Sequence, residues 1–171
     1  MGKQKMKKFI FLFFVFSLAW CWDSWTSWDI KEYNNSLIAL QTQSVDIVKD
    51  YYEWLEKRYD GLNLLEMFTW TVDKLQWIEK IAELSPNWKD DSELKDAVTN
   101  YISWLQLAFI RYEWPVVEML LDYTWQVSHF YRDNQSFFSD SAMKFAWELA
   151  VLDKELDWYY VHFSEKYWYD K

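Results

Sequence analysis

The chain has 171 residues, and its 27 Asp and Glu outnumber its 18 Lys and Arg, so the formal net charge at pH 7 is −9. This acidic balance argues against nucleic-acid binding, because phosphates need compensating cations. The single cysteine excludes an intrachain disulfide, so an apolar core must hold the fold together. A domain of about 150 residues buries roughly 70% of its extended-chain surface, which is sufficient for such a core.

The first 20 residues have the charge and hydropathy pattern of an export signal. An apolar run over residues 9–19 follows a basic segment without acidic residues, which contains Lys3, Lys5, Lys7 and Lys8. The run is about half of the roughly 20 residues that a membrane-spanning helix needs. The pattern therefore predicts a cleaved signal peptide over residues 1–20.

The apolar run ends in Leu18-Ala19-Trp20-Cys21, which resembles the lipobox of bacterial lipoproteins. In that family the cysteine thiol is acylated and the preceding peptide bond is cut. The resemblance implies that Cys21 is the lipidated first residue of the mature protein, carrying palmitate-type chains on the extracytoplasmic side of the cell membrane. Trp20 departs from the family pattern, which has Gly or Ala at this position.

The composition offers an explanation for Trp20. The chain contains 14 Trp and only 2 Gly, whereas Gly normally makes up about 7% of a protein. Reading Trp as Gly gives a regular lipobox, turns residues 22–29 into a Gly/Ser tether, and makes Trp114-Pro115 a Gly-Pro turn signal. We therefore hypothesise that many of these tryptophans are UGA codons of a bacterium that reads UGA as glycine, as some candidate-phylum bacteria do.

The alternative is a naturally tryptophan-rich protein. Seven of the tryptophans lie inside expected helices, where each glycine would cost about 1 kcal/mol relative to Ala. Some of the tryptophans can therefore be genuine.

Beyond the tether, apolar residues recur at spacings of three and four, which is the pattern of amphipathic helices. The expected helices span about residues 30–59, 62–84, 92–113, 115–132 and 141–169. Pro115 predicts a break or sharp kink between the third and fourth segments, and Asp90 with Glu93 suggests a capping box before the third. Residues expected on the buried stripes include Leu37, Leu65, Phe68, Leu105, Ala142 and Phe145.

The expected fold is all-α, an antiparallel up-and-down bundle of four to five helices in one domain over residues 30–171. Residues 21–29 form the lipidated cysteine and a flexible tether. Several tyrosines lie on the apolar stripes, and we expect them at the edges of the core with their hydroxyls in water. Residues 133–140 are expected to connect the last two segments.

No motif in the sequence indicates catalysis or a cofactor. Neither His129 nor His162 has the Glu-x-x-His spacing of di-iron bundles, since Gln126 and Tyr159 stand three residues before them. Residues 90–93 lack the order of a calcium loop, and phosphate-loop, zinc and nucleophile-elbow motifs are absent from the sequence. The acidic residues fit solvated helix faces. We expect a protein without enzymatic activity, metal or cofactor.

These features lead to a membrane-anchored envelope lipoprotein with a non-enzymatic interaction or spacer domain. Its partners would be the membrane, through lipid on Cys21, and an envelope protein or wall glycan, but not nucleic acid. Residues 32–41 are also similar to the opening helix of several uncharacterised helical bacterial lipoproteins, which implies the same architecture.

The alternative function is a ligand- or wall-glycan-binding lipoprotein that uses aromatic residues in a groove between helices. Trp147 and Trp158 fall off the apolar stripe of the last helix, and exposed indoles can stack on sugars. This aromatic face disappears if both residues are glycines. A groove lined by tyrosines and carboxylates would favour this function, and a closed core would favour the interaction or spacer domain.

Overall fold

Four long helices make up most of the computed structural model, which describes residues 30–57, 61–122 and 135–168. They are α2 (Ile30–Lys57), α3 (Gly61–Leu84), α4 (Glu93–Asp122) and α6 (Gln135–Trp168). The expected signal peptide and tether, with Cys21, lie outside the described residues. The chain divides into two compact parts, Met1–Tyr33 and Asn34–Lys171, and the packing below is that of the second part.

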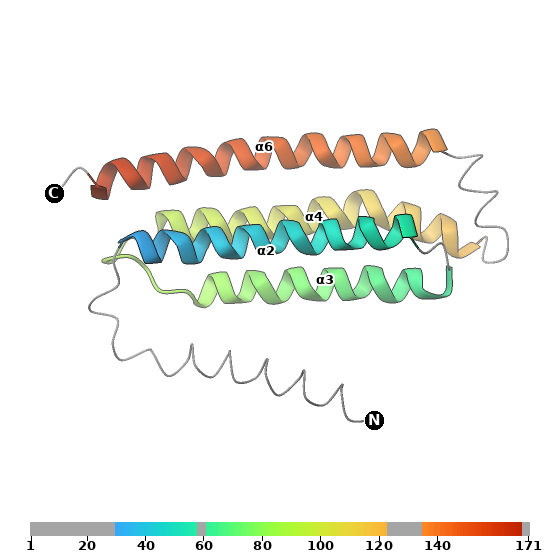
Figure 1. Ribbon diagram of the computed structural model, residues 1–171, viewed down its shortest axis with the longest axis horizontal. Helices are drawn as coiled ribbons and strands as arrows, with labels where there is room; N and C mark the ends of the chain where they lie inside the picture. Colours follow the sequence, from blue (N-terminus) through green and yellow to red (C-terminus); the bar gives the residue numbers. More distant parts are fainter. Residues whose placement is uncertain (1–29, 58–60, 123–134, 169–171) are drawn as a thin grey trace, which may run out of the picture. The chain divides into compact units, whose positions relative to one another are not determined.

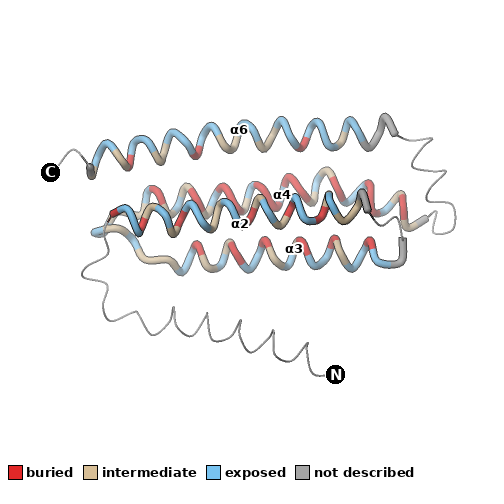
Figure 2. Tube along the Cα trace, viewed as in Figure 1, coloured by how far each residue is buried: buried red, intermediate tan, exposed pale blue. Residues whose placement is uncertain are grey.

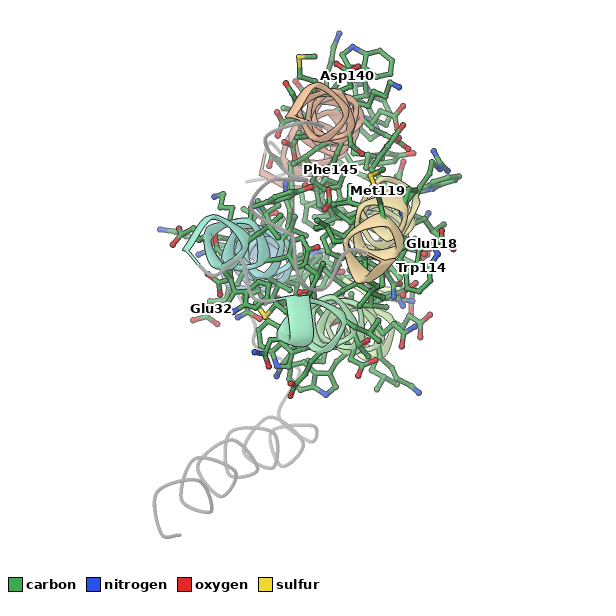
Figure 3. The ribbon with its side chains drawn as sticks, turned by 90° about the vertical axis from the view of Figure 1, so that its right-hand side faces the viewer. Glu32, Trp114, Glu118, Met119, Asp140 and Phe145 are labelled. Carbon is green, nitrogen blue, oxygen red and sulfur yellow. The ribbon has the colours of Figure 1, made fainter. Side chains whose placement is uncertain are left out.

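The helices of the second part form an up-and-down bundle. Figure 1 shows that each helix runs antiparallel to the helix before it. The end-on view in Figure 3 places α2 opposite α4, with α3 and α6 on the two sides between them. The all-α, antiparallel bundle expected from the sequence is confirmed.

The core consists of inward-facing stripes, which Figure 2 shows most clearly on α3 and α4. On α3 the buried positions are Leu64, Phe68, Thr71, Leu75, Ile78 and Ala82. They alternate in spacings of four and three, as expected for one face of a helix packed in a bundle. The buried positions of α6 are only Phe145, Leu156 and Phe163 among its described side chains.

Two expected core positions are wrong. Leu65 is 41% exposed and its neighbour Leu64 is buried, because hydropathy cannot distinguish two adjacent leucines. The buried position after Phe68 on α3 is occupied by the polar residue Thr71. Its hydroxyl donates to the Met67 carbonyl at 2.9 Å, so its hydrogen-bonding capacity is met inside the helix. Ala142, expected on the buried stripe, is exposed.

Of the two outcomes expected at Pro115, a break or a sharp kink, the break is wrong, because α4 runs as one helix from Glu93 to Asp122. Proline has no N–H to donate to the carbonyl four residues earlier, and in a helix interior it costs about 3 kcal/mol. Val116 and Val117 directly after it are 2% and 0% exposed. In addition, the hydroxyl of Ser141 on α6 donates to the Tyr112 carbonyl at 2.8 Å. Packing and this bond keep the segment helical despite the proline.

The segment expected to connect the last two helices is partly helical. Residues 135–140 belong to the start of α6, whereas residues 123–132 of the expected fourth helix lie outside the described residues.

The turn between α3 and α4 is organised by Asp91 rather than by Asp90. Asp91 Oδ1 accepts the N–H of Glu93 at 2.9 Å at the start of α4, so the expected Asp90 cap is wrong by one residue. Asp90 instead has a left-handed backbone with φ of 70°. Asp91 Oδ2 accepts hydrogen bonds from Lys166 Nζ at 2.7 Å and from the Tyr167 hydroxyl at 2.6 Å, which attaches the end of α6 to this turn.

Candidate functional site

A carboxylate is buried in the interior of the bundle. Glu113 on α4 is only 2% exposed. Its position follows from helical spacing, since it stands four residues after Phe109 and three before Val116, which are both buried. Residues three and four apart share a helix face, so the stripe that builds the core of α4 carries Glu113 into the interior.

Two adjacent tyrosines of α2 face this carboxylate. The Tyr52 hydroxyl donates to Glu113 Oε1 at 2.5 Å. The Tyr51 side chain is fully buried, and its hydroxyl has no hydrogen bond of good geometry. It nevertheless lies close enough to Glu113 for each group to act on the pKa of the other. We call Glu113, Tyr51 and Tyr52 the acid–phenol cluster.

Aromatic rings from α3, α4 and α6 lie around the cluster. The Phe109 ring of α4 meets the Tyr51 ring edge-on, with centroids 4.9 Å apart, and stacks on Phe68 of α3 at 5.5 Å. Phe145 points from α6 toward the interior (Figure 3), and its ring centroid lies 6.4 Å from Phe109 and 6.0 Å from Tyr52. The carboxyl of Glu113 is therefore enclosed in an apolar environment.

Burial raises the pKa of the Glu113 carboxyl to about 7. The hydroxyls of Tyr52 and Tyr51, which stabilise the charged form, oppose this shift only in part. Burial and the nearby carboxylate in turn raise the pKa of both tyrosines above the usual range, so the phenols stay protonated. Glu113 therefore changes its charge near neutral pH.

No cation balances this charge among the described side chains that act on it. The nearby basic residue Arg111 points outward instead, and its guanidinium contacts Glu148 of α6 at 3.1 Å. Arg111 and Glu148 form a partly exposed ion pair at the surface. The charged form of Glu113 is thus stabilised by phenol hydroxyls alone, which is unusual for a buried carboxylate.

A second phenol–carboxylate bond joins α4 to α6. The hydroxyl of Tyr101 donates to Asp153 Oδ1 at 2.7 Å, and Tyr101 is 3% exposed. Burial, followed by the bond to Asp153, raises the Tyr101 pKa above its usual range. The expectation that the core tyrosines keep their hydroxyls in water is wrong for Tyr51 and Tyr101, because nearby carboxylates take the place of water.

The aromatic face expected on the last helix is present on the outside of α6. Trp147 is 72% exposed and Trp158 is 57% exposed. The Trp158 ring stacks on the exposed His162 ring, with centroids 5.1 Å apart and an interplanar angle of 7°. A shallow, open hollow on the surface is lined by α3 residues such as Trp77 and Lys80 and by Gln106 of α4, without any residue of α6.

The tryptophans share one property in the described part of the chain, which is that none belongs to the buried core. Trp54 and Trp88 are half-buried. The exposed ones are Trp70, Trp77, Trp104, Trp114, Trp147 and Trp158. Tryptophan is normally among the more buried residue types on average. The core is therefore built from Leu, Ile, Val, Phe and Tyr without any indole among these side chains.

The structure does not bring together the residues that the sequence indicated as candidate sites. Leu18, Ala19, Trp20, Cys21 and His129 lie outside the described residues. Within residues 30–57, 61–122 and 135–168, no three His, Cys, Asp or Glu side chains are placed to hold a metal ion. In the same ranges, no helix combines the length and apolar character needed to cross a bilayer.

The sequence reasoning missed Glu113, although a signal for it exists. A charged residue that stands on an apolar stripe, between Phe109 and Val116, is a candidate buried acid. The third helix was expected to end at Glu113, before Pro115, so the apolar stripe was not followed across Glu113 to Val116.

Comparisons of the chain with protein-family models, with curated proteins and with solved structures found no match.

Proposed function

We propose that the chain is a membrane-anchored envelope lipoprotein whose helical bundle is a non-enzymatic interaction or spacer domain. The observation that carries the proposal is the pattern Leu18-Ala19-Trp20-Cys21 at the end of a short apolar run behind four lysines. Lipid on Cys21 holds the domain on the extracytoplasmic side of the cell membrane. Removal of residues 1–20, which contain those lysines and no acid, changes the net charge from −9 to −13, so acyl chains rather than basic residues provide the attachment.

The interior of the bundle supports a domain without enzymatic activity. A carboxylate and two phenols converge in the acid–phenol cluster, but Glu113 is 2% exposed and Tyr51 is fully buried. A catalytic acid or base must come within hydrogen-bond reach of its substrate. Tyr52 is half-buried, and the rings of Phe109 and Phe145 pack against Tyr51 and Tyr52 respectively.

The mechanism would be tethering. An anchored domain is confined to the plane of the membrane, which raises its effective concentration toward a neighbouring envelope partner. The helices give this domain reach, since α6 has 34 residues and a helix rises about 1.5 Å per residue, or about 50 Å for its whole length.

We further propose that many of the tryptophans are glycines in the native protein. The exposure of Trp70, Trp104, Trp147 and Trp158 supports this proposal, because their replacement would remove no indole from the core. The replacement would weaken helix propensity by about 1 kcal/mol at each exposed interior position relative to Ala.

A second function applies if the tryptophans are genuine. Trp147 and Trp158 then form an exposed aromatic face on α6, which favours a lipoprotein that stacks on wall glycan. Binding of the full chain to purified wall glycan, lost in the W147A/W158A double variant, would support this function over the first.

Metabolic labelling with an alkyne analogue of palmitate tests the anchor. The wild type should incorporate the label and fractionate with membranes, and C21S should incorporate none. The matched control S24A, three residues into the tether, should be labelled like the wild type. A wild type without label, or a C21S variant that is labelled equally, would refute the anchor. Incorporation of the label is the decisive readout. Membrane fractionation is not, because an uncleaved signal peptide can hold C21S at the membrane.

A further inference from the structure

The acid–phenol cluster has no part in anchoring, and its arrangement indicates a different role. We propose that Glu113 is a pH-dependent switch in the bundle, in which the neutral carboxyl holds α2 against α4 and its ionisation loosens α4 around Pro115. The proposal goes beyond the anchoring function and does not depend on it.

The hydrogen-bonding groups of the cluster can accommodate a neutral carboxyl. Tyr52 donates its hydroxyl hydrogen to Glu113 Oε1, which leaves the second carboxyl oxygen. The buried Tyr51 hydroxyl has no well-formed hydrogen bond, and its oxygen can accept the proton of a carboxylic acid. A protonated Glu113 can therefore donate to Tyr51 while it accepts from Tyr52. An ionised Glu113 can accept from both phenols, but burial opposes its charge more strongly than these hydrogen bonds favour it.

Among the described side chains, none places an opposite charge beside an ionised Glu113. On α2 the groups that act on it are the phenols of Tyr51 and Tyr52. On the side of α3, the Phe68 ring stacks on Phe109, which packs against Tyr51. On the side of α6, the Phe145 ring contacts Tyr52. Of the charged groups nearby on α4 and α6, Arg111 and Glu148 are paired with each other, and Glu118 and Lys144 are exposed. Ionisation therefore favours entry of water into this part of the core.

The backbone of α4 is weakest next to this site. Pro115 stands two residues after Glu113 and donates no hydrogen bond to the Arg111 carbonyl. The Tyr112 carbonyl is held by Ser141 of α6, so the helix at this point depends on its neighbour. Because Glu113 joins α4 to α2 just before this proline, residues 111–122 are the segment expected to open when Glu113 ionises.

Hydrogen exchange of the full chain in detergent, measured from pH 5 to pH 8, tests the switch. After correction for the intrinsic exchange rate, opening of residues 111–122 should increase on the order of 100-fold in the wild type, from a carboxyl pKa of about 7 in the folded state and 4.5 when exposed. The E113Q variant, which mimics the neutral carboxyl, should show no such increase. The matched control E118Q, exposed on the same helix, should behave like the wild type.

A second variant separates the switch from a purely structural role. Y52F removes the hydroxyl that stabilises the ionised carboxylate, so the midpoint of opening should move to higher pH. A pH-independent wild type, an E113Q variant that follows the wild type, or a Y52F midpoint that does not move would each overturn the proposal.

Direct titration of the Glu113 carboxyl carbon by NMR in the wild type decides the matter if the variants fail to fold. A midpoint near 7 is expected. A midpoint near the ordinary glutamate value of about 4.3 would overturn the switch.

Discussion

Phe109 is the side chain through which the helices of the bundle are held together, and its truncation should be among the most destabilising changes. The residue is fully buried, and its ring contacts Tyr51 of α2, Phe68 of α3 and Phe145 of α6. A buried Phe→Ala change costs about 3–5 kcal/mol through lost transfer energy and the cavity left behind. Each aromatic pair adds about 0.5–1.5 kcal/mol beyond area burial. We therefore expect F109A near the upper end of the range.

Urea denaturation followed by circular dichroism measures this loss. A domain of this size has a free energy of unfolding of about 5–15 kcal/mol, so F109A should lower the midpoint strongly or leave the chain largely unfolded. The matched control is L107A, two residues earlier on α4 and 48% exposed, which should cost less than about 1 kcal/mol. If F109A lost no more stability than L107A, the core described above would be wrong.

Two further predictions concern the turn before α4 and the tryptophans. D91A removes the acceptor of the Glu93 N–H and of Lys166 and Tyr167, and the lost cap alone should lower the free energy of unfolding by about 1 kcal/mol in a urea titration. Burial tends to raise the Asp91 pKa, but the hydrogen bonds outweigh it and hold the pKa below its ordinary value. The stabilisation by Asp91 is therefore present above about pH 4 and lost below it. If D91A lost as much stability below pH 4 as the wild type, this role of Asp91 would be contradicted. Mass spectrometry of the native tether peptide should show glycine masses at positions 22 and 25, and indole masses there would rule out the recoding hypothesis.

Where the sequence carries long regular stripes, it predicts the fold well. The expected second helix over residues 62–84 differs from α3 by one residue at its start, because six inward positions alternate regularly in spacings of four and three. The end of α2 is similarly close, at Lys57 against about residue 59. Local hydropathy is sufficient here because packing follows the same face throughout.

The remaining errors arise where tertiary contacts override local preference. Pro115 should break a helix on its own, but buried valines after it and the bond from Ser141 keep α4 continuous. Asp90 and Asp91 are equally good caps by residue type, and only the position of Lys166 and Tyr167 at the end of α6 favours Asp91. Contacts between residues about 75 positions apart are not visible in a local pattern.

The candidate site also depends on contacts between residues that are far apart in the sequence. That Glu113 stands on an apolar stripe can be read from its spacing to Phe109, but its pairing with Tyr52 joins residues 61 positions apart. The strength of the effect on the carboxyl depends on enclosure by Phe68 and Phe145, which only the packed bundle provides. The sequence can therefore locate a buried acid but cannot predict its pKa.

The mass of the N-terminal peptide of the native protein tests the central claim most directly. The account predicts a mature chain that begins at Cys21 and carries acyl groups on that residue. A chain that still begins at Met1, or a Cys21 with a free thiol, would contradict the lipid anchor.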